Sequence, residues 1–357
     1  MNNLNNIKQI KELDTENMLN AIGDLPNQIE SAWKLAQNIK IPASYININK
    51  IVMCGMGGSG ISADIVKMLA FKTSKIPFFV IKGYALPSFV DEQTLVIATS
   101  YSGDTEETLA AFSQAATLKA KLFAITTGGK LELLAKKLKS PIFTFSYESQ
   151  PRAALGYLLT PALYVCSKIG ALEITEAETQ ETITILKNYN LLWRPQNPEL
   201  KNLAKQFAKK IYGFIPILWT NTLNEAIALR WKGSINENAK TQSFTDYFSE
   251  LNHNSLVGVN YPQKLGQKII IIFLKSSTDS DRITLREAIT IRILQEHKIP
   301  FIEINLPDHK SILITILSSI SLGDYISYYL AILNGVNPTP TPSIIYLKEQ
   351  LDVKDKK

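Results

Sequence analysis

The chain has 357 residues, of which 45% are hydrophobic and 20% charged, with a formal net charge of +6. This length predicts about two globular domains, and the composition excludes a fibrous or largely disordered chain. Two cysteines, Cys54 and Cys166, are too few for a disulfide framework or a multi-cysteine metal site. The first twenty residues are polar and lack the apolar core of a signal peptide, so we expect a cytoplasmic protein.

The positive charge and one long apolar run each raise an alternative class of protein. The basic residues cluster in helical-looking segments without interleaved aromatic side chains, so we expect a solvated basic surface and no nucleic-acid partner. Residues 312–333 are long enough to cross a membrane, but Asp324 and several serines interrupt them. Because an ionised carboxylate is costly in lipid, we interpret this segment as a buried core helix and expect no membrane association.

Short apolar runs alternate with helical patterns from residue 49 onward. We predict strands at residues 51–54, 78–82, 94–99, 121–126 and 141–145. The intervening patterns predict a helix ending near residue 71 and helices at residues 105–118 and 130–138. After a polar stretch at residues 188–202, the pattern predicts strands at 215–220, 269–274 and 299–306 and helices at 221–233, 283–297 and 310–333.

Continuous apolar strands separated by helices are typical of parallel sheets that are covered on both faces. The fold class is therefore α/β, with two tandem units that are each a mainly parallel sheet flanked by helices. We predict four segments: an N-terminal helical segment at 1–45, a first domain at 46–190, a second at 200–335 and a C-terminal extension at 336–357.

The first predicted strand leads into a glycine-rich turn, Gly55-Met-Gly-Gly-Ser-Gly60, before a helix. Glycines let the backbone approach an anion, and the free N–H groups of a helix N-terminus bind it. A dinucleotide site would also need an acidic residue after the next strand, where this chain has Lys82-Gly83-Tyr84. We interpret the turn as an anion cradle without a nucleoside pocket; the alternative is a tight turn without a ligand.

A second turn, Ser100-Tyr-Ser-Gly-Asp-Thr105, follows the strand at 94–99 and opens another helix. The hydroxyls of Ser100, Ser102 and Thr105 suit a tetrahedral oxyanion such as phosphate. Taken alone, such a turn more commonly only caps a helix. Two such turns in one sheet, without a nucleoside signal, favour a sugar phosphate.

Three further motifs make the pattern specific: Pro-Arg-Ala-Ala-Leu-Gly-Tyr at 151–157, Arg230-Trp-Lys with Asn236-Glu-Asn, and His253-Asn254. The two turns resemble the phosphate turns of sugar isomerase (SIS) domains. From the glycine turn onward, the combination resembles the bifunctional phosphoglucose/phosphomannose isomerases, which have two tandem SIS domains. One departure is Asp104, where that family more often has Asn; we expect its side chain to cap the helix and point away from phosphate.

The resemblance implies the activity and the chemistry of the site. It implies the interconversion of glucose 6-phosphate or mannose 6-phosphate with fructose 6-phosphate through a cis-enediolate, with no cofactor. Glu237 would carry the proton between C1 and C2, and Arg152 would stabilise the enediolate. His253 would open the sugar ring from the neighbouring subunit of a homodimer, and Lys348 would also lie at the active site.

Phosphate binding and substrate choice follow from the same resemblance. Thr341 would be a small residue that leaves room for the second C2 epimer and so for mannose 6-phosphate. The phosphate would be bound by residues of the two turns, namely Gly57, Gly58, Ser59, Ser100, Ser102 and Thr105. The glycine turn has no counterpart after the strand at 215–220, so we expect one phosphate site per chain.

Two other functions compete with this reading. A non-catalytic SIS-domain sensor of sugar phosphates would need the two turns but neither Glu237 nor His253. An amidotransferring glucosamine-phosphate synthase would need an N-terminal cysteine, whereas this sequence begins Met1-Asn2. The three histidines, His253, His297 and His309, have no spacing typical of a metal site, and we expect none. His297 is expected to cap a helix, and His309 to be a solvated loop residue.

Overall fold

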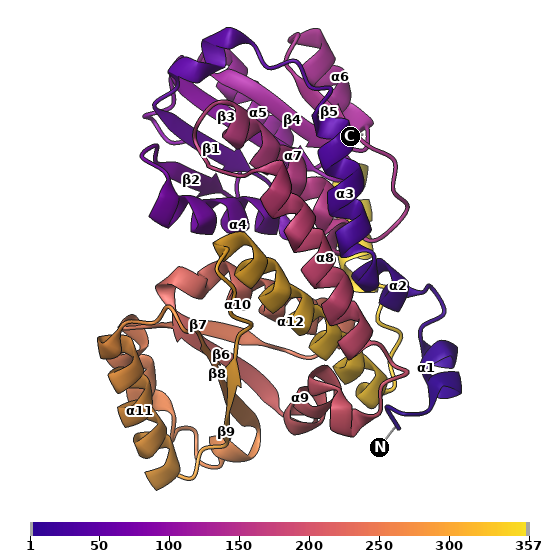
Figure 1. The fold of residues 1–357 in the computed structure, drawn as a ribbon, viewed down its shortest axis with the longest axis vertical. Helices are drawn as coiled ribbons and strands as arrows, with labels where there is room; N and C mark the ends of the chain where they lie inside the picture. The colour runs from indigo at the N-terminus through magenta and orange to yellow at the C-terminus, as the bar shows by residue number, and fades with distance from the viewer. Residues whose placement is uncertain (1–2, 355–357) are drawn as a thin grey trace.

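The computed structural model describes residues 3–354, so the outer ends of the predicted segments 1–45 and 336–357 lie outside the described residues. The chain forms two α/β units that lie one above the other in Figure 1. Each unit is a parallel sheet with helices on both faces. The predicted fold class is therefore confirmed.

The first sheet has five parallel strands in the order β2-β1-β3-β4-β5. The strands are β1 Lys50–Cys54, β2 Phe78–Ile81, β3 Thr94–Ser100, β4 Lys121–Thr126 and β5 Ile142–Thr144. Helices α4 Gly57–Thr73 and α7 Leu155–Lys168 cover one face, and α5 Glu106–Thr117 and α6 Gly129–Lys137 cover the other. Successive residues of β1 alternate between these faces, so Ile51 packs toward α4 and α7 and Val52 toward α5 and α6.

The second sheet has four parallel strands in the order β7-β6-β8-β9. The strands are β6 Ile215–Asn221, β7 Phe244–Phe248, β8 Ile269–Lys275 and β9 Phe301–Asn305. Helices α9 Leu203–Ile211, α10 Glu225–Asn238 and α12 Ile312–Asn334 cover one face, and α11 Asp281–Glu296 covers the other. Strand β7 was not predicted, because its residues Phe-Thr-Asp-Tyr-Phe lack a continuous apolar run.

Helices pack across the boundary between the two units. Helix α8, Glu176–Trp193, packs against both α3, Leu25–Ala36, and α12 (Figure 1). The first part of the polar stretch at 188–202 is helical: α8 continues to Trp193, whose buried indole stacks on Tyr189. Helix α4 of the first unit packs on α10 of the second, so the two sheets share a helical interface.

Helix α12 contains the long apolar run at residues 312–333. It is the one helix within residues 3–354 that is long and apolar enough to cross a membrane, and its apolar window is entirely buried inside the protein. Asp324 accepts a hydrogen bond from Arg230 there, and Ser327 accepts one from Asn238. The prediction of a buried core helix is confirmed.

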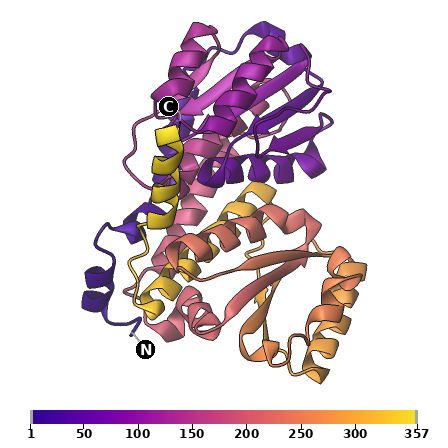
Figure 2. The same cartoon turned by 180° about the vertical axis from the view of Figure 1, so that it is seen from behind.

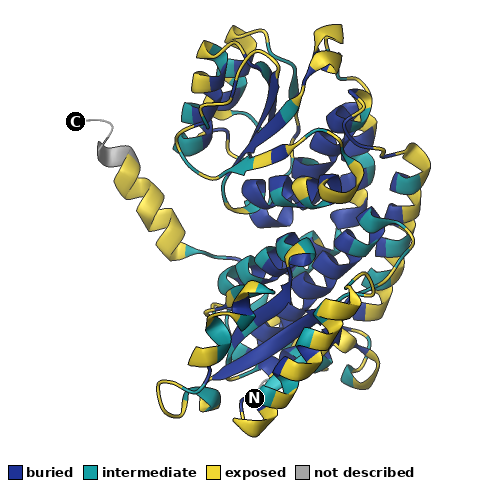
Figure 3. Ribbon diagram, turned by 90° about the vertical axis from the view of Figure 1, so that its left-hand side faces the viewer, coloured by how far each residue is buried: buried dark blue, intermediate teal, exposed yellow. Residues whose placement is uncertain are grey.

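The two ends of the described chain differ in their packing. Helices α1 Ile7–Leu13 and α2 Met18–Gly23 lie along the second unit, and Tyr328 of α12 donates a hydrogen bond to Asp14 between them. Helix α13, Pro342–Lys354, emerges on the side that faces the reader in Figure 2 and stands clear of both sheets in Figure 3. Its apolar side chains, including Ile345 and Tyr346, are exposed.

Candidate functional site

The two predicted anion turns meet at the carboxyl edge of the first sheet. Strands β1 and β3 are hydrogen-bonded neighbours, so the turns that follow them emerge side by side. The backbone N–H of Tyr101 donates to Ser59 Oγ at 3.1 Å, which ties one turn to the other. Ser100 Oγ lies 3.0 Å from Thr105 Oγ1 and accepts from the Gly103 N–H at 3.1 Å. Three hydroxyls are thus gathered at two helix N-termini.

Gly58 brings the first turn into contact with a distant segment. A Cβ at this position would lie 2.8 Å from the backbone of Pro151 and Arg152, so only glycine permits this approach. The start of α4 therefore lies directly against the segment that carries Arg152. The expected anion cradle and the expected enediolate-binding arginine are brought together.

Asp104 lies on the second turn but is directed at a different helix from the one expected. Its carboxylate accepts a hydrogen bond from the Lys130 N–H at 3.1 Å, in the first turn of α6. The expectation that it caps its own helix is wrong, since α5 begins at Glu106 and has no side-chain cap. The side chain is held at the α6 N-terminus, where a negative charge is favourable.

Arg152 is buried rather than exposed in a helix. It lies in a short 3₁₀ turn, Pro151–Ala153, ahead of α7, and its side chain is only 5% exposed. Nε donates to Asn238 Oδ1 at 2.7 Å, and Nη2 donates to the carbonyls of Pro338 at 2.9 Å and Thr339 at 2.7 Å. Nη1 alone faces Glu237, with Oε2 at 3.3 Å.

The surroundings of Arg152 set its electrostatics. Burial lowers the pKa of the guanidinium, and the facing Glu237 carboxylate opposes that shift. The group is nonetheless a cation at neutral pH, because an arginine starts from a very high pKa. The Nε donor and both Nη2 donors are hydrogen-bonded to other protein groups. Nη1 is therefore the part of the guanidinium that interacts with Glu237.

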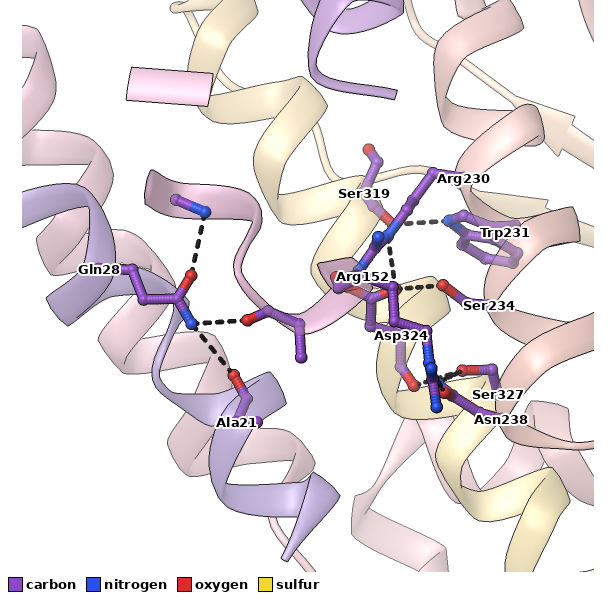
Figure 4. Close-up of polar contacts among 12 residues, drawn as sticks. Ala21, Gln28, Arg152, Arg230, Trp231, Ser234, Asn238, Ser319, Asp324 and Ser327 are labelled. Carbon is purple, nitrogen blue, oxygen red and sulfur yellow. Dashed lines mark hydrogen bonds and ion pairs between the residues drawn. The ribbon is translucent and has the colours of Figure 1, made fainter. Parts of the chain in front are cut away.

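A buried ion pair between Arg230 and Asp324 contacts the backbone of Arg152 (Figure 4). Arg230 of α10 donates to both carboxylate oxygens of Asp324 on α12, at 2.9 and 2.8 Å. Arg230 Nη2 also donates to the carbonyl of Arg152 at 2.7 Å, and Ser234 Oγ donates to Asp324 at 2.6 Å. Both charged side chains are 7% exposed. The pair therefore fixes the Arg152 backbone to the second unit.

These groups surround a cavity of about 210 Å³ between the two units. The first unit contributes Gly57 and Gly58 to its lining, and the second contributes Glu237 from the end of α10, with Arg152 between them. The other charged or amide side chains that line it are Asp64, Lys82, Arg230, Lys232 and Asn236. A larger groove of about 1000 Å³, lined by the N-terminal helices and the end of α8, contains none of the predicted site residues.

Comparisons with known proteins identify a known domain family in each of the two units. A model of the SIS domain matches residues 44–137, and a model of the bacterial phospho-glucose isomerase C-terminal SIS domain matches residues 200–351. The bifunctional phosphoglucose/phosphomannose isomerase of Caldicellulosiruptor bescii is 39% identical over 95% of this chain and 100% of its own length. The chain belongs to the bifunctional phosphoglucose/phosphomannose isomerase family.

Two further comparisons extend this result. The family member from Aquifex aeolicus is 36% identical and aligns with 84% of this chain and 90% of its own length. The solved C-terminal domain of glucosamine-fructose-6-phosphate aminotransferase from Francisella tularensis has a TM-score of 0.67 at 17% identity, covering 90% of this chain and 98% of that domain. The second match shows that the fold is shared.

Several of the predicted site residues lie outside the cavity. His253 follows a 3₁₀ turn, Glu250–Asn252, and is exposed. Lys348 is exposed on α13, and the Thr341 carbonyl accepts hydrogen bonds from the first turn of that helix. Neither these three residues nor Ser102, which is also exposed, contribute to the cavity lining.

The other two histidines do not line the cavity either. His297 caps the end of α11, as expected. His309 lies in a loop, as expected, but it is half-buried, with Nε2 3.1 Å from the Tyr189 hydroxyl. Within residues 3–354, no group of three histidine, cysteine or carboxylate side chains is arranged to hold a metal ion.

Sequence reasoning missed the residues that hold the site together. Asn238 lies in the quoted Asn-Glu-Asn motif but had no assigned role, and it accepts from Arg152. Gln28 of α3 donates to the carbonyl of Ala153 at 2.7 Å and accepts from the Gly156 N–H at 3.0 Å (Figure 4). The only signal for Asp324 was its polarity within an apolar helix, which marks a buried partner.

Proposed function

We propose that the chain is an aldose–ketose isomerase that interconverts glucose 6-phosphate or mannose 6-phosphate with fructose 6-phosphate. One observation carries the proposal: Arg152 Nη1 and Glu237 Oε2 face each other at 3.3 Å in a cavity that also contains Gly57 and Gly58 of the anion turn. A cation, a carboxylate and a phosphate cradle are the groups that this reaction needs.

The phosphate binds at the carboxyl edge of the first sheet. The hydroxyls of Ser100 and Thr105 lie 3.0 Å apart, and the Ser59 hydroxyl accepts from the N–H of Tyr101, which follows Ser100. The N-termini of α4 and α5 contribute free N–H groups beside them. Backbone amides of Gly57 and Gly58 and the exposed Ser102 hydroxyl complete the phosphate-binding set. The sugar then extends from this edge toward Arg152 and Glu237.

The reaction is a proton transfer between neighbouring carbons. The Glu237 carboxylate takes the C2 proton of the open-chain aldose, and the electron pair of the broken C–H bond forms the C1–C2 double bond of the enediolate. Arg152 Nη1 stabilises the oxygen that gains charge. Glu237 returns the proton to C1 while the hydroxyl proton moves from O2 to O1, which gives the ketose.

Mannose 6-phosphate enters by the same route, because C2 of the enediolate is planar. In the reverse direction, a proton delivered to one face of C2 gives glucose 6-phosphate, and delivery to the other face gives mannose 6-phosphate. Thr341, at the start of α13, is the small residue that leaves space for the second epimer.

We assign ring opening to His253, contributed across a homodimer, and place Lys348 of α13 at the active site as well. What supports a shared site is that both side chains are exposed and outside the cavity of their own chain, while α13 stands clear of the body. We also propose a cytoplasmic location, which agrees with two buried, unpaired cysteines.

A subunit-mixing experiment tests the shared site. Glu237→Gln and His253→Asn chains, each inactive alone, are denatured together and refolded. If His253 acts across the interface, one of the two sites in a mixed dimer has both native residues, and a 1:1 mixture regains about a quarter of the wild-type activity. A mixture as inactive as its components contradicts the shared site.

The activity itself is tested with purified protein treated with a chelator. We expect fructose 6-phosphate to give both glucose 6-phosphate and mannose 6-phosphate, measured by separate coupled assays, at the same rate before and after chelation. A protein that binds hexose phosphates without converting them would instead be a sensor, and the proposed function would be wrong.

A further inference from the structure

We propose that Lys240, which follows α10, is a positioning residue that locks the two reacting groups of the site together. This inference rests on the proposed isomerase function. Lys240 Nζ donates to the Glu237 carbonyl at 2.5 Å and to the Pro338 carbonyl at 3.2 Å. One ammonium thus connects the end of the helix that carries Glu237 with the turn that leads to α13.

The Pro338 carbonyl is also an acceptor for Arg152, whose Nη2 lies 2.9 Å from it. Two cations from different segments therefore converge on one backbone oxygen. Arg152 further donates to Thr339 and to Asn238, the residue that follows Glu237. The 338–339 turn determines which donors of Arg152 are used, and Lys240 holds that turn against the end of α10.

The backbone at Lys240 provides a matched control for removing its side chain. Lys240 has a φ of +54°, in the left-handed region where glycine is favoured and a side chain is strained. Lys139, after α6, has the same φ of +54°, is exposed as Lys240 is, and has no role in the site. Replacing either lysine by glycine relieves the same backbone strain, and only Lys240→Gly removes an amine from the site.

The amine of Lys240 has a lower pKa than an ordinary lysine. Burial lowers the pKa of Lys240 to about 8 and Arg152 acts in the same direction, while the carboxylates of Glu237 and Glu16 oppose them. As the pH rises through this value the ammonium loses its proton, so its hydrogen bonds to the two carbonyls lose their charge assistance. Arginine at this position would stay charged throughout.

The test compares Lys240→Gly, Lys240→Arg and the matched control Lys139→Gly by steady-state kinetics and thermal unfolding. We expect Lys240→Gly to lower kcat about 10- to 100-fold, because a misplacement of about 1 Å costs that much. KM should change less than about threefold, because Lys240 contacts no phosphate-binding residue. The melting temperature should not fall in either glycine variant, and Lys139→Gly should keep its kcat.

The pH dependence provides a second readout. Wild-type kcat should decline above about pH 8, and Lys240→Arg should retain activity there. A normal kcat in Lys240→Gly, a loss explained by a lower melting temperature, or the same alkaline decline in Lys240→Arg would each overturn the role of Lys240. Inactive wild-type protein would instead refute the isomerase function, and this inference with it.

Discussion

Replacing Glu237 by Gln is expected to lower kcat by about 10²- to 10⁴-fold, the usual contribution of a positioned acid–base group. The amide has the same shape as the carboxylate and still accepts a hydrogen bond from Arg152 Nη1, which lies 3.3 Å from Oε2. The amide is much less basic than the carboxylate, so it cannot carry the proton between C1 and C2. Initial rates with fructose 6-phosphate measure the loss.

The control is Glu225→Gln, the same change at the opposite end of the same helix. Glu225 does not line the cavity, so this variant should keep its kcat. Glu237→Gln should remain folded, because the amide still accepts a hydrogen bond from Arg152 and the Nε and Nη2 donors of that arginine keep their acceptors on Asn238, Pro338 and Thr339. A Glu237→Gln enzyme with near-normal kcat would show that another group carries the proton.

Replacing Asp324 by Ala is expected to have the largest effect on stability. It leaves Arg230 as a buried cation without its carboxylate, which costs about 3–5 kcal/mol of unfolding free energy. The same change frees the segment that Arg230 holds through the Arg152 carbonyl, at 2.7 Å, so activity should fall as well. Urea unfolding measures the stability, and assays below the unfolding transition measure the activity.

Two comparisons isolate the cause of that loss. Glu132→Ala breaks an exposed pair with Lys136, at 2.6 Å on α6, and should cost about 1 kcal/mol or less. The double variant Arg230→Met/Asp324→Leu removes both charges and should recover part of the stability, though not the support of Arg152. If Asp324→Ala unfolds at the wild-type urea concentration, the buried pair does not hold the two units together.

The parts of the fold that could be predicted are those encoded locally. Strand β3 is a run of buried residues. The turns after β1 and β3 are predicted by glycine and hydroxyl residues that lie between a strand and a helix. Strand β7 has no such signature, since its aromatic residues flank Asp246 and pairing with β6 determines its structure. Helix α8 continues to Trp193, whose side chain is buried by the rest of the protein. The polar residues around it do not predict this burial.

The candidate site divides in the same way. The resemblance selected Arg152 and Glu237, but what fixes Arg152 is Asn238, 86 residues later, and Thr339, 187 residues later. Lys240 likewise reaches Pro338 across 98 residues of sequence. Pairings at such separations follow from the docking of two units, and the periodicity of either unit alone contains no information about them.

The most direct test of the account is the conversion of fructose 6-phosphate by the purified, chelator-treated protein in D₂O. We predict that glucose 6-phosphate and mannose 6-phosphate both form and that both contain deuterium at C2, because a carboxylate exchanges its proton with solvent during the enediolate's lifetime. Products without deuterium would show that the transferred hydrogen never exchanges with solvent, which would contradict transfer by an exchanging Glu237 carboxylate. No conversion would contradict the isomerase function itself.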